Sequence, residues 1–281
     1  MEKNLITSLL RVYHSDKTRH ANNRVLARFV EEYNIGERVG ASFTFSESDK
    51  EDIRQLLLAS EGIDTAITSP EQWFGLTRAE SLAYGGNEKL TDSSVRSDRV
   101  AIKTLPGKPL MLNGQSITLP NGVNLDLDWH WLVSNHKTVL LVENWEAFNG
   151  IHQVTFNLSR AGENPLVVFR GSPVYRQDYV ISLLRKLAVP VYAFVDFDPA
   201  GLVIAQSLPF FSGLIAPPFE VLELALAKAK NQNRYLSQLP EAKGALDRTP
   251  NQEIAQHWRQ IQAHGKALPQ EYFLMENFSQ N

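Results

Sequence analysis

Two stretches of the chain consist of valine-rich apolar residues and end abruptly in acidic ones. Residues 139–144 are VLLVEN, and residues 191–202 are VYAFVDFDPAGL. Continuous apolar runs are typical of parallel strands covered on both faces, whereas half-exposed hairpin strands alternate between apolar and polar residues. The carboxyl ends of parallel strands meet at one edge of the sheet, where α/β proteins bind their ligands. The two runs therefore predict an α/β fold with a functional site at that edge.

Three carboxylates would meet at this edge, Glu143 after the first run and Asp196 and Asp198 after the second. Asp196 and Asp198 are two residues apart, so on a strand their side chains point the same way. Like charges this close repel each other unless a cation lies among them, and an all-oxygen ligand set favours Mg²⁺ or Mn²⁺. A simpler interpretation stands beside this one: Asp198 caps a helix that begins at Pro199, and Asp196 is only a strand-end residue.

From residue 137 onwards, predicted strands alternate with predicted helices. The strands are expected at 138–142, 166–169 and 191–195, and the helices at 175–187 and 199–206. This alternation favours a parallel sheet with right-handed crossovers, and we assign residues 135–281 to one domain with a helical C-terminal tail. The loop after the second strand contains Arg170 and Gly171, which could approach a phosphate group or could form an ordinary exposed turn.

Residues 1–95 are predicted to be a mainly helical region. A capping box beginning at Ser48 is expected to start one helix, and residues 41–45 alternate like a short strand. Such a region suits a winged-helix-like module, or equally a helical cap that supports the second domain.

Residues 96–134 predict a β-rich connector, because short apolar runs alternate with Asn-Gly turns. Within it, Asp126, Asp128 and His130 resemble metal ligands by residue type. The alternation of residues 124–128 assigns them more simply to the wet face of a strand.

Together these motifs resemble a Toprim domain, the metal-binding α/β module of topoisomerases, primases and several nucleases. Within that group, the segments 142–144 (VEN) and 196–201 (DFDPAG) are most similar to the nuclease subunit of Wadjet-type (JetD or MksG) systems. Phe148 and Gly171 fit the same pattern, and Val195 stands where that family often has glycine. The segment 267–271 (ALPQE) is similar to the end of that family, and the match spans about residues 137–274.

The resemblance implies a Mg²⁺- or Mn²⁺-dependent endonuclease that hydrolyses DNA phosphodiester bonds. It also implies two kinds of partner, DNA and a condensin-like complex of SMC and kleisin subunits that acts against plasmids, and it allows a homodimer. The metal would be held by Glu143, Asp196 and Asp198. Asn144 would orient Glu143 or hold a metal-bound water, and Gly171 and Gly201 would have supporting roles. Glu271 would add a carboxylate or lie at the surface. Apart from the resemblance, the candidate contacts to the DNA backbone are basic residues: Arg170, Arg176, and a C-terminal cluster of Lys228, Lys230, Arg234, Arg259 and Lys266.

Composition narrows the alternatives. The chain of 281 residues has no cysteine, which excludes disulfides, thiolate zinc sites and cysteine nucleophiles. A net charge of −3 argues against coating nucleic acid by bulk electrostatics. The sequence has no stretch apolar and long enough for a signal peptide or a membrane span, so a cytoplasmic protein is expected.

Three other functions use part of the same pattern. A type IIB topoisomerase subunit, a distant relative of the Wadjet nucleases, needs a tyrosine nucleophile upstream, for which Tyr33 and Tyr84 are the candidates. A haloacid-dehalogenase-type phosphatase also has Asp-x-Asp after an apolar strand. That motif normally opens the domain and is followed by a second acidic strand end, whereas here Asp196 lies late in the chain and no second acidic strand end follows it. A non-catalytic regulatory or DNA-binding subunit with a relic Toprim site is the third, and retention of all three carboxylates argues against it.

Overall fold

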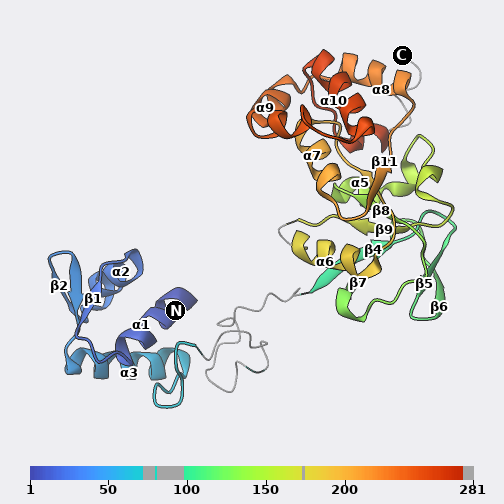
Figure 1. Ribbon diagram of the computed structural model, residues 1–281. Helices are drawn as coiled ribbons and strands as arrows, with labels where there is room; N and C mark the ends of the chain where they lie inside the picture. Colours follow the sequence, from blue (N-terminus) through green and yellow to red (C-terminus); the bar gives the residue numbers. More distant parts are fainter. Residues whose placement is uncertain (72–79, 81–97, 173–174, 275–281) are drawn as a thin grey trace. The chain divides into compact units, whose positions relative to one another are not determined.

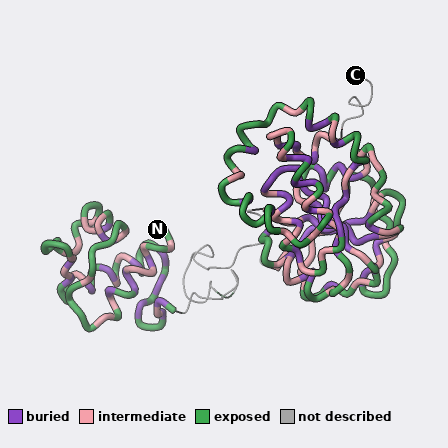
Figure 2. The backbone as a smooth tube through the Cα atoms, turned by 45° about the horizontal axis from the view of Figure 1, so that its top comes forward, coloured by how far each residue is buried: buried purple, intermediate pink, exposed green. Residues whose placement is uncertain are grey.

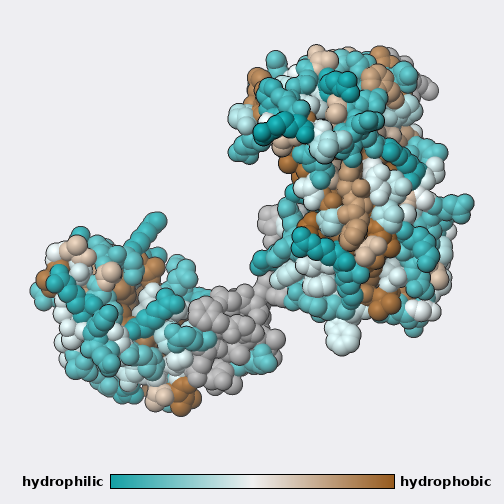
Figure 3. All heavy atoms as spheres, in the orientation of Figure 1, coloured by the Kyte–Doolittle hydropathy of each residue, from teal (hydrophilic) through white to brown (hydrophobic). Residues whose placement is uncertain are grey.

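The computed structural model describes residues 1–71, 80, 98–172 and 175–274. The chain divides into two compact units, Met1–Val95 and Arg96–Asn281, shown in Figure 1. Polar side chains cover much of the visible surface of each unit (Figure 3), since the large apolar side chains are mostly turned inward. None of the described helices is both long and apolar enough to cross a membrane.

The N-terminal unit packs short strands against helices around its own apolar core. Its described elements are α1 (Lys3–Tyr13), β1 (Arg19–Ala21), α2 (Arg24–Tyr33), β2 (Glu37–Val39), β3 (Ser42–Thr44) and α3 (Glu47–Glu61). The strands form an antiparallel sheet in the order β1-β3-β2. The expected strand at 41–45 is therefore present as β3, but it belongs to a sheet that the sequence did not predict.

The capping box of α3 begins two residues earlier than expected. Ser46, not Ser48, is the N-cap: its hydroxyl accepts a hydrogen bond from the N–H of Asp49 at 3.1 Å. The Asp49 carboxylate accepts the N–H of Ser46 at 2.7 Å in return. The prediction was wrong because several polar residues in this segment satisfy the same pattern, and only the reciprocal bonds select one of them.

The second unit is built on a six-stranded mixed sheet in the order β11-β10-β8-β9-β4-β7. The strands are β4 (Arg99–Lys103), β7 (Leu125–Asp128), β8 (Val139–Val142), β9 (Leu166–Phe169), β10 (Val191–Phe194) and β11 (Phe211–Leu214). The four strands from β11 to β9 run parallel, and β4 and β7 are antiparallel to their neighbours. Every residue of β8 is buried, and in β10 all but Tyr192 are buried, which agrees with the expected covering of both apolar runs. Buried backbone is concentrated inside this unit (Figure 2). An α/β fold is thus confirmed, with a sheet that is parallel only in part.

Residues 96–134 belong to this unit and do not stand apart as a connector. They contribute β4, which pairs with β9, and β7, which pairs with β4 at the sheet edge. They also form the hairpin of β5 (Pro109–Leu112) and β6 (Gln115–Thr118), and a 3-10 turn, η2 (Trp129–Trp131), follows β7.

Helices complete the second unit around the sheet (Figure 1). They are α5 (Trp145–Asn149), α6 (Gln177–Leu187), α7 (Pro199–Ser207), α8 (Phe219–Lys228), α9 (Gln232–Leu246) and α10 (Gln252–His264), with 3-10 turns η3 (Ile151–Gln153), η4 (Ser159–Ala161) and η5 (Gln270–Leu274). The helix α7 follows β10 directly and packs against α9 and α10, so the end of β10 lies close to segments from much later in the chain.

Candidate functional site

The first two predicted acidic residues lie side by side at the carboxyl ends of β8 and β10. These strands are parallel neighbours, with Val142 opposite Phe194 in the register. The backbone N–H of Asp196 donates a hydrogen bond to Oε2 of Glu143 at 3.1 Å. The N–H of Glu143 in turn donates to the carbonyl of Phe194 at 3.0 Å. The sequence predicts that both residues lie at one edge of the sheet, and the register of β8 and β10 brings them into contact there.

Asp198 takes part in the same cluster and also caps a helix. Its Oδ1 accepts the N–H of Gly201 at 2.7 Å, and Pro199 is the first residue of α7, as the simpler interpretation of this motif requires. Asp198 is 1% exposed, and its other oxygen, Oδ2, faces side chains of α9. The helix-cap interpretation is therefore confirmed for Oδ1 of Asp198, and the metal-ligand interpretation stays a prediction that concerns Oδ2.

Glycine is required at two positions beside the cluster. A Cβ atom on Gly201 would lie 2.1 Å from the carbonyl oxygen of Asp196, so α7 can approach the strand end only without a side chain there. Gly171 has φ +114°, and a Cβ atom there would lie 2.5 Å from the carbonyl oxygen of Tyr175. Both glycines act by shaping the backbone.

Arg234 on α9 bridges the two aspartates. Its Nη2 lies 2.5 Å from Oδ2 of Asp196, and its Nε lies 2.8 Å from Oδ2 of Asp198. Gln238, one helical turn further on, donates from Nε2 to the same Oδ2 of Asp198 at 3.0 Å. The sequence predicts Arg234 as a candidate contact to DNA, but in the structure it forms ion pairs with Asp196 and Asp198. The only sequence signal that Arg234 and Gln238 act together is their spacing of four residues, which puts both side chains on one face of a helix.

The segment around Leu268 and Gln270 packs against the strand ends and brings Gln270 to the cluster. The backbone groups of Phe197 and Leu268 bond to each other in both directions, at 2.8 and 3.1 Å. Gln270 is fully buried: its N–H donates to Oδ1 of Asp196 at 2.8 Å, and its Oε1 accepts the N–H of Asn144 at 2.8 Å. One residue thus ties together the ends of β8 and β10, and sequence reasoning had treated it only as part of a resemblance.

Glu271, the candidate fourth carboxylate, lies near Asp196: burial raises the pKa of Asp196, and the charge of Glu271 adds a smaller effect in the same direction. Its Oε2 is buried and accepts no hydrogen bond from the described residues. Asn144 uses Oδ1 to cap α5 through the N–H of Glu146 at 3.0 Å. Orientation of Glu143, the role expected of Asn144, comes instead from the N–H of Asp196.

Of the predicted basic residues, Arg170 lies at the cluster. Its Nη1 is 3.7 Å from Oε1 of Glu143, and its Nη2 donates to Gln177 at 3.1 Å. Arg176 instead pairs with Asp178 at 2.7 Å on an exposed surface. Lys228 and Lys230 are exposed at the end of α8 and just after it, in the segment that leads into α9.

The candidate metal ligands Asp126, Asp128 and His130 lie in or just after β7, at the edge of the sheet away from β10, and they interact with residues there. Asp126 pairs with Arg99 at 2.5 Å, and it accepts a hydrogen bond from the hydroxyl of Tyr175 at 2.9 Å. Asp128 accepts the N–H of His130 at 2.9 Å. All four residues of β7 are partly exposed, so the aspartates reach solvent as expected, but the predicted alternation with buried residues is absent.

Burial and neighbouring charges shift the pKa values of the cluster. Burial raises the pKa of Glu143 to about 7, and the charge of Asp196 adds to this effect, whereas Arg170 opposes it. Burial also raises the pKa of Asp196, although the N–H of Gln270 and the charge of Arg234 favour its ionised form. For Arg234, burial lowers the pKa, but the charges of Asp198 and Asp196 outweigh it and the net shift is upward. The carboxylates are therefore not fully compensated by the arginines, and a further cation would stabilise them.

The ligand chemistry of the cluster suits Mg²⁺ or Mn²⁺, because every side chain that could bind an ion there does so through carboxylate oxygen. In the conformation described, however, no three His, Asp or Glu side chains among the described residues are grouped as a metal site requires. Oδ2 of each aspartate is bonded to Arg234. A divalent ion could share both aspartates only after Arg234 moved away.

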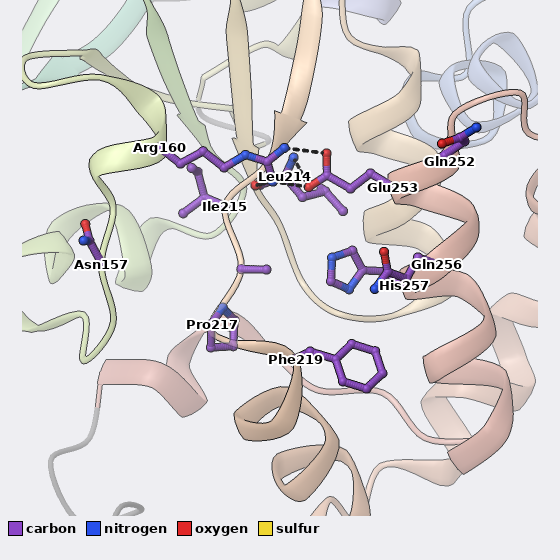
Figure 4. A pocket seen from close by; sticks show the side chains of 11 residues that line it. Asn157, Arg160, Leu214, Ile215, Pro217, Phe219, Gln252, Glu253, Gln256 and His257 are labelled. Atoms are coloured by element: carbon purple, nitrogen blue, oxygen red, sulfur yellow. Dashed lines mark hydrogen bonds and ion pairs between the residues drawn. The ribbon is translucent and has the colours of Figure 1, made fainter.

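A separate pocket of about 500 Å³ lies beyond the carboxyl end of β11 (Figure 4). Arg160 and Glu253 face each other in it with a 2.9 Å hydrogen bond, and Arg160 also donates to the carbonyl of Leu214 at 2.9 Å. Its charged groups thus neutralise each other. Glu143, Asp196 and Asp198 are not among the described residues that line this pocket.

Fold and site together define an α/β protein with an acidic cluster at the carboxyl edge of a mixed sheet. The chain belongs to the family described as Domain of unknown function (DUF7281), whose model matches residues 97–279. The match covers the sheet, the acidic residues, Arg234 and Gln270. A comparison with curated proteins finds no match.

Proposed function

We propose that the protein is a Mg²⁺- or Mn²⁺-dependent DNA endonuclease with a Toprim-like catalytic domain. One observation carries the proposal: Glu143 and Asp196 are hydrogen-bonded neighbours at the ends of adjacent parallel strands, with Asp198 two residues further on. Buried carboxylates that repel each other at a ligand-binding edge are typical of sites that bind a cation. The resemblance of the segments 142–144 and 196–201 to Toprim nucleases supplies the reaction.

When bound, the ion would activate water and stabilise the charge that develops on the leaving oxygen of the phosphodiester. The chain's own residues hold the ligands in place. Gln270 fixes Asp196 through Oδ1, and the N–H of Gly201 fixes Asp198 through Oδ1. The carboxyl group of Glu143, with a pKa of about 7, is partly protonated at neutral pH, and a bound cation would favour its ionised form. Arg170 lies beside Glu143 with a side chain 22% exposed and can bind a phosphate oxygen of the DNA.

The partners of this nuclease follow from the same resemblance. We propose that it acts as the effector of a condensin-like SMC–kleisin complex against plasmids, as a cytoplasmic protein and as a monomer or homodimer. The net charge of −3 fits an enzyme to which another complex delivers the DNA better than one that gathers DNA by its own field.

A second function is favoured by one specific observation. Arg234 already bridges Asp196 and Asp198, so the cluster could serve as a structural ion-pair network in a non-catalytic DNA-binding or regulatory subunit. Such a protein would gain stability from the pair without binding a metal. The two functions differ in whether divalent ions bind at all.

The test is cleavage of supercoiled plasmid by the full chain in Mn²⁺ or Mg²⁺, with and without its SMC-type partner proteins. Asp196→Asn should abolish cleavage and remain folded, because the amide can still accept the N–H of Gln270. Asp178→Asn, an exposed aspartate in a surface pair, is the matched control and should cleave normally. Cleavage by the Asp196→Asn protein at the wild-type rate would show that the chemistry lies elsewhere. Absence of metal binding in the wild type would favour the non-catalytic subunit.

A further inference from the structure

Arg234 holds the same two oxygen atoms that a metal would need. In Asp196, Oδ1 is bonded to the N–H of Gln270, and in Asp198, Oδ1 is bonded to the N–H of Gly201. Backbone amides therefore occupy one oxygen of each aspartate. The other oxygen of each, Oδ2, faces Arg234, at 2.5 Å in Asp196 and 2.8 Å in Asp198. A cation that binds both aspartates must displace the guanidinium group.

We propose that Arg234 exchanges partners during the reaction cycle: it bridges the two aspartates before the metal binds, and it binds a DNA phosphate after the metal has displaced it. The proposal rests on the proposed nuclease function and adds a substrate-binding residue and an order of events to it. Arg234 is thus a competitor of the metal in the free protein and a ligand of the substrate in the loaded one.

The position of Arg234 allows both states. It is the third residue of α9, so its side chain lies at the start of the helix, and the side chain is 42% exposed although it reaches aspartates that are almost fully buried. A long side chain with its stem at the surface can turn outward without moving the helix. The planar fork of its Nε and Nη2 donors, which now spans two carboxylates, matches two oxygens of a phosphate group equally well.

Gln238 would keep Asp198 oriented during this exchange. Its Nε2 donates to Oδ2 of Asp198 at 3.0 Å, and its Oε1 accepts the N–H of Ala200 at 3.2 Å. This neutral residue therefore links α9 to the start of α7 independently of Arg234. Departure of the guanidinium would leave Asp198 in place with a free lone pair for the ion.

Charge balance gives the reason for a phosphate as the second partner. Glu143, Asp196, Asp198 and the nearby Glu271 carry four negative charges when ionised, and Arg170 and Arg234 carry two positive ones. A divalent ion among the carboxylates would neutralise this negative excess. The displaced guanidinium would then lose its attraction to the carboxylates and could attract an anion brought from outside. In a DNA-cleaving enzyme that anion is the backbone phosphate. Lys228 and Lys230, which are exposed just before α9, would add further positive charge for binding DNA.

The test compares the full chain with Arg234→Gln, Arg234→Lys and Arg259→Gln, the last being an exposed arginine of α10 that bonds within its own helix. In calorimetric titration with Mn²⁺ alone, Arg234→Gln should bind the ion at least about tenfold more tightly than the wild type, because a charge-assisted bond to each aspartate is removed. Arg259→Gln should match the wild type. Arg234→Lys, which keeps the charge without the fork, should lie between them.

The second measurement is DNA binding in Ca²⁺, by fluorescence anisotropy of a labelled duplex that a denaturing gel shows to be intact. Here Arg234→Gln should bind at least about tenfold more weakly than the wild type, since it lacks the fork for the phosphate. Tighter Mn²⁺ binding combined with weaker DNA binding is a result that a merely structural arginine would not give.

Each alternative result has a distinct meaning. If Mn²⁺ binds the wild type and is lost in Asp196→Asn, but Arg234→Gln binds it no more tightly, the partner exchange is wrong while the nuclease proposal stands. If DNA affinity is unchanged in Arg234→Gln, Arg234 does not bind the phosphate. If the wild type binds no Mn²⁺, both proposals fail. Should Arg234→Gln be unfolded without metal, the Mn²⁺ dependence of its melting temperature, with Arg234→Lys as the folded reference, replaces the titration.

Discussion

The buried carboxyl group of Glu143 predicts how folding stability depends on pH. Its pKa rises from 4.5 to about 7 in the folded protein, because burial and the charge of Asp196 disfavour the ionised form. The folded state therefore binds this proton more tightly than the unfolded chain does. The contribution of Glu143 to stability is fully present below its unfolded pKa of 4.5 and is lost as the pH rises through about 7.

The size of this loss follows from the two pKa values. The rise from 4.5 to about 7 corresponds to about 3 kcal/mol, at roughly 1.4 kcal/mol for each pKa unit. Glu143→Gln replaces the carboxyl group by a neutral amide of the same shape, which can still accept the N–H of Asp196. Without divalent ions, we expect the variant to equal the wild type near pH 4.5 and to exceed its free energy of unfolding by about 3 kcal/mol near pH 8.

The assay is urea unfolding in EDTA, followed by tryptophan fluorescence over this pH range. Four of the five tryptophans, Trp129, Trp131, Trp145 and Trp258, belong to Arg96–Asn281, so the signal reports mainly on the unit that contains Glu143. Glu146→Gln, an exposed residue of α5, is the matched control and should follow the wild-type profile.

The difference between variant and wild type isolates Glu143 from other titrating groups. His136 and His257 have pKa values lowered by burial, so their contribution is lost as the pH falls, which is the opposite trend. Both histidines are present in both proteins and their effects cancel in the comparison. A stability difference that stays constant between pH 5 and pH 8 would refute the argument that Glu143 is a buried, repelled carboxyl group.

Two further predictions test the backbone and the chemistry. Gly201→Ala should lower the free energy of unfolding by about 1–3 kcal/mol in urea, because its Cβ would overlap the carbonyl of Asp196; Gly244→Ala, whose nearest neighbour is 3.6 Å away, should not destabilise α9. After DNA cleavage and denaturation, the cut ends should be free of protein, as for hydrolysis by activated water. Protein covalently linked to DNA would instead support a tyrosine nucleophile. Of the candidates, Tyr33 stacks on Phe29 at 5.1 Å, and Tyr84 lies outside the described residues.

The acidic strand ends could be predicted because their signal is local. A buried parallel strand is an uninterrupted apolar run, and the first polar residue after it must stand at the sheet edge. Glu143 and Asp196 follow this rule directly, and the register of β8 and β10 then brings them together. The antiparallel pairing of β4 and β7 was not predictable in this way, because a short strand carries no mark of the sheet that it will join.

Arg234 and Gln270 were missed as parts of the cluster for the opposite reason. Arg234 lies 38 residues beyond Asp196, and Gln270 lies 74 beyond it. On α9 a basic residue with polar neighbours is typical of a solvated helix face, and no periodicity distinguishes an arginine that reaches inward. Gln270 stands in a 3-10 turn with no period at all. Only the packing of α9 on α7, and the bridge between Phe197 and Leu268, bring these residues to the strand ends.

The hydrogen bonds of the two aspartates explain why one short motif supports both a structural and a catalytic interpretation. A carboxylate has two oxygens. In Asp196 and Asp198, backbone N–H groups donate to Oδ1, and Oδ2 faces the guanidinium group of Arg234. The amide bonds fix the direction of each side chain, so the two Oδ2 atoms are held in position without a metal. Arg234 then offsets their charge in the free protein. A helix cap and a metal ligand are therefore compatible roles for Asp198, and the discriminating question becomes which cation occupies its second oxygen.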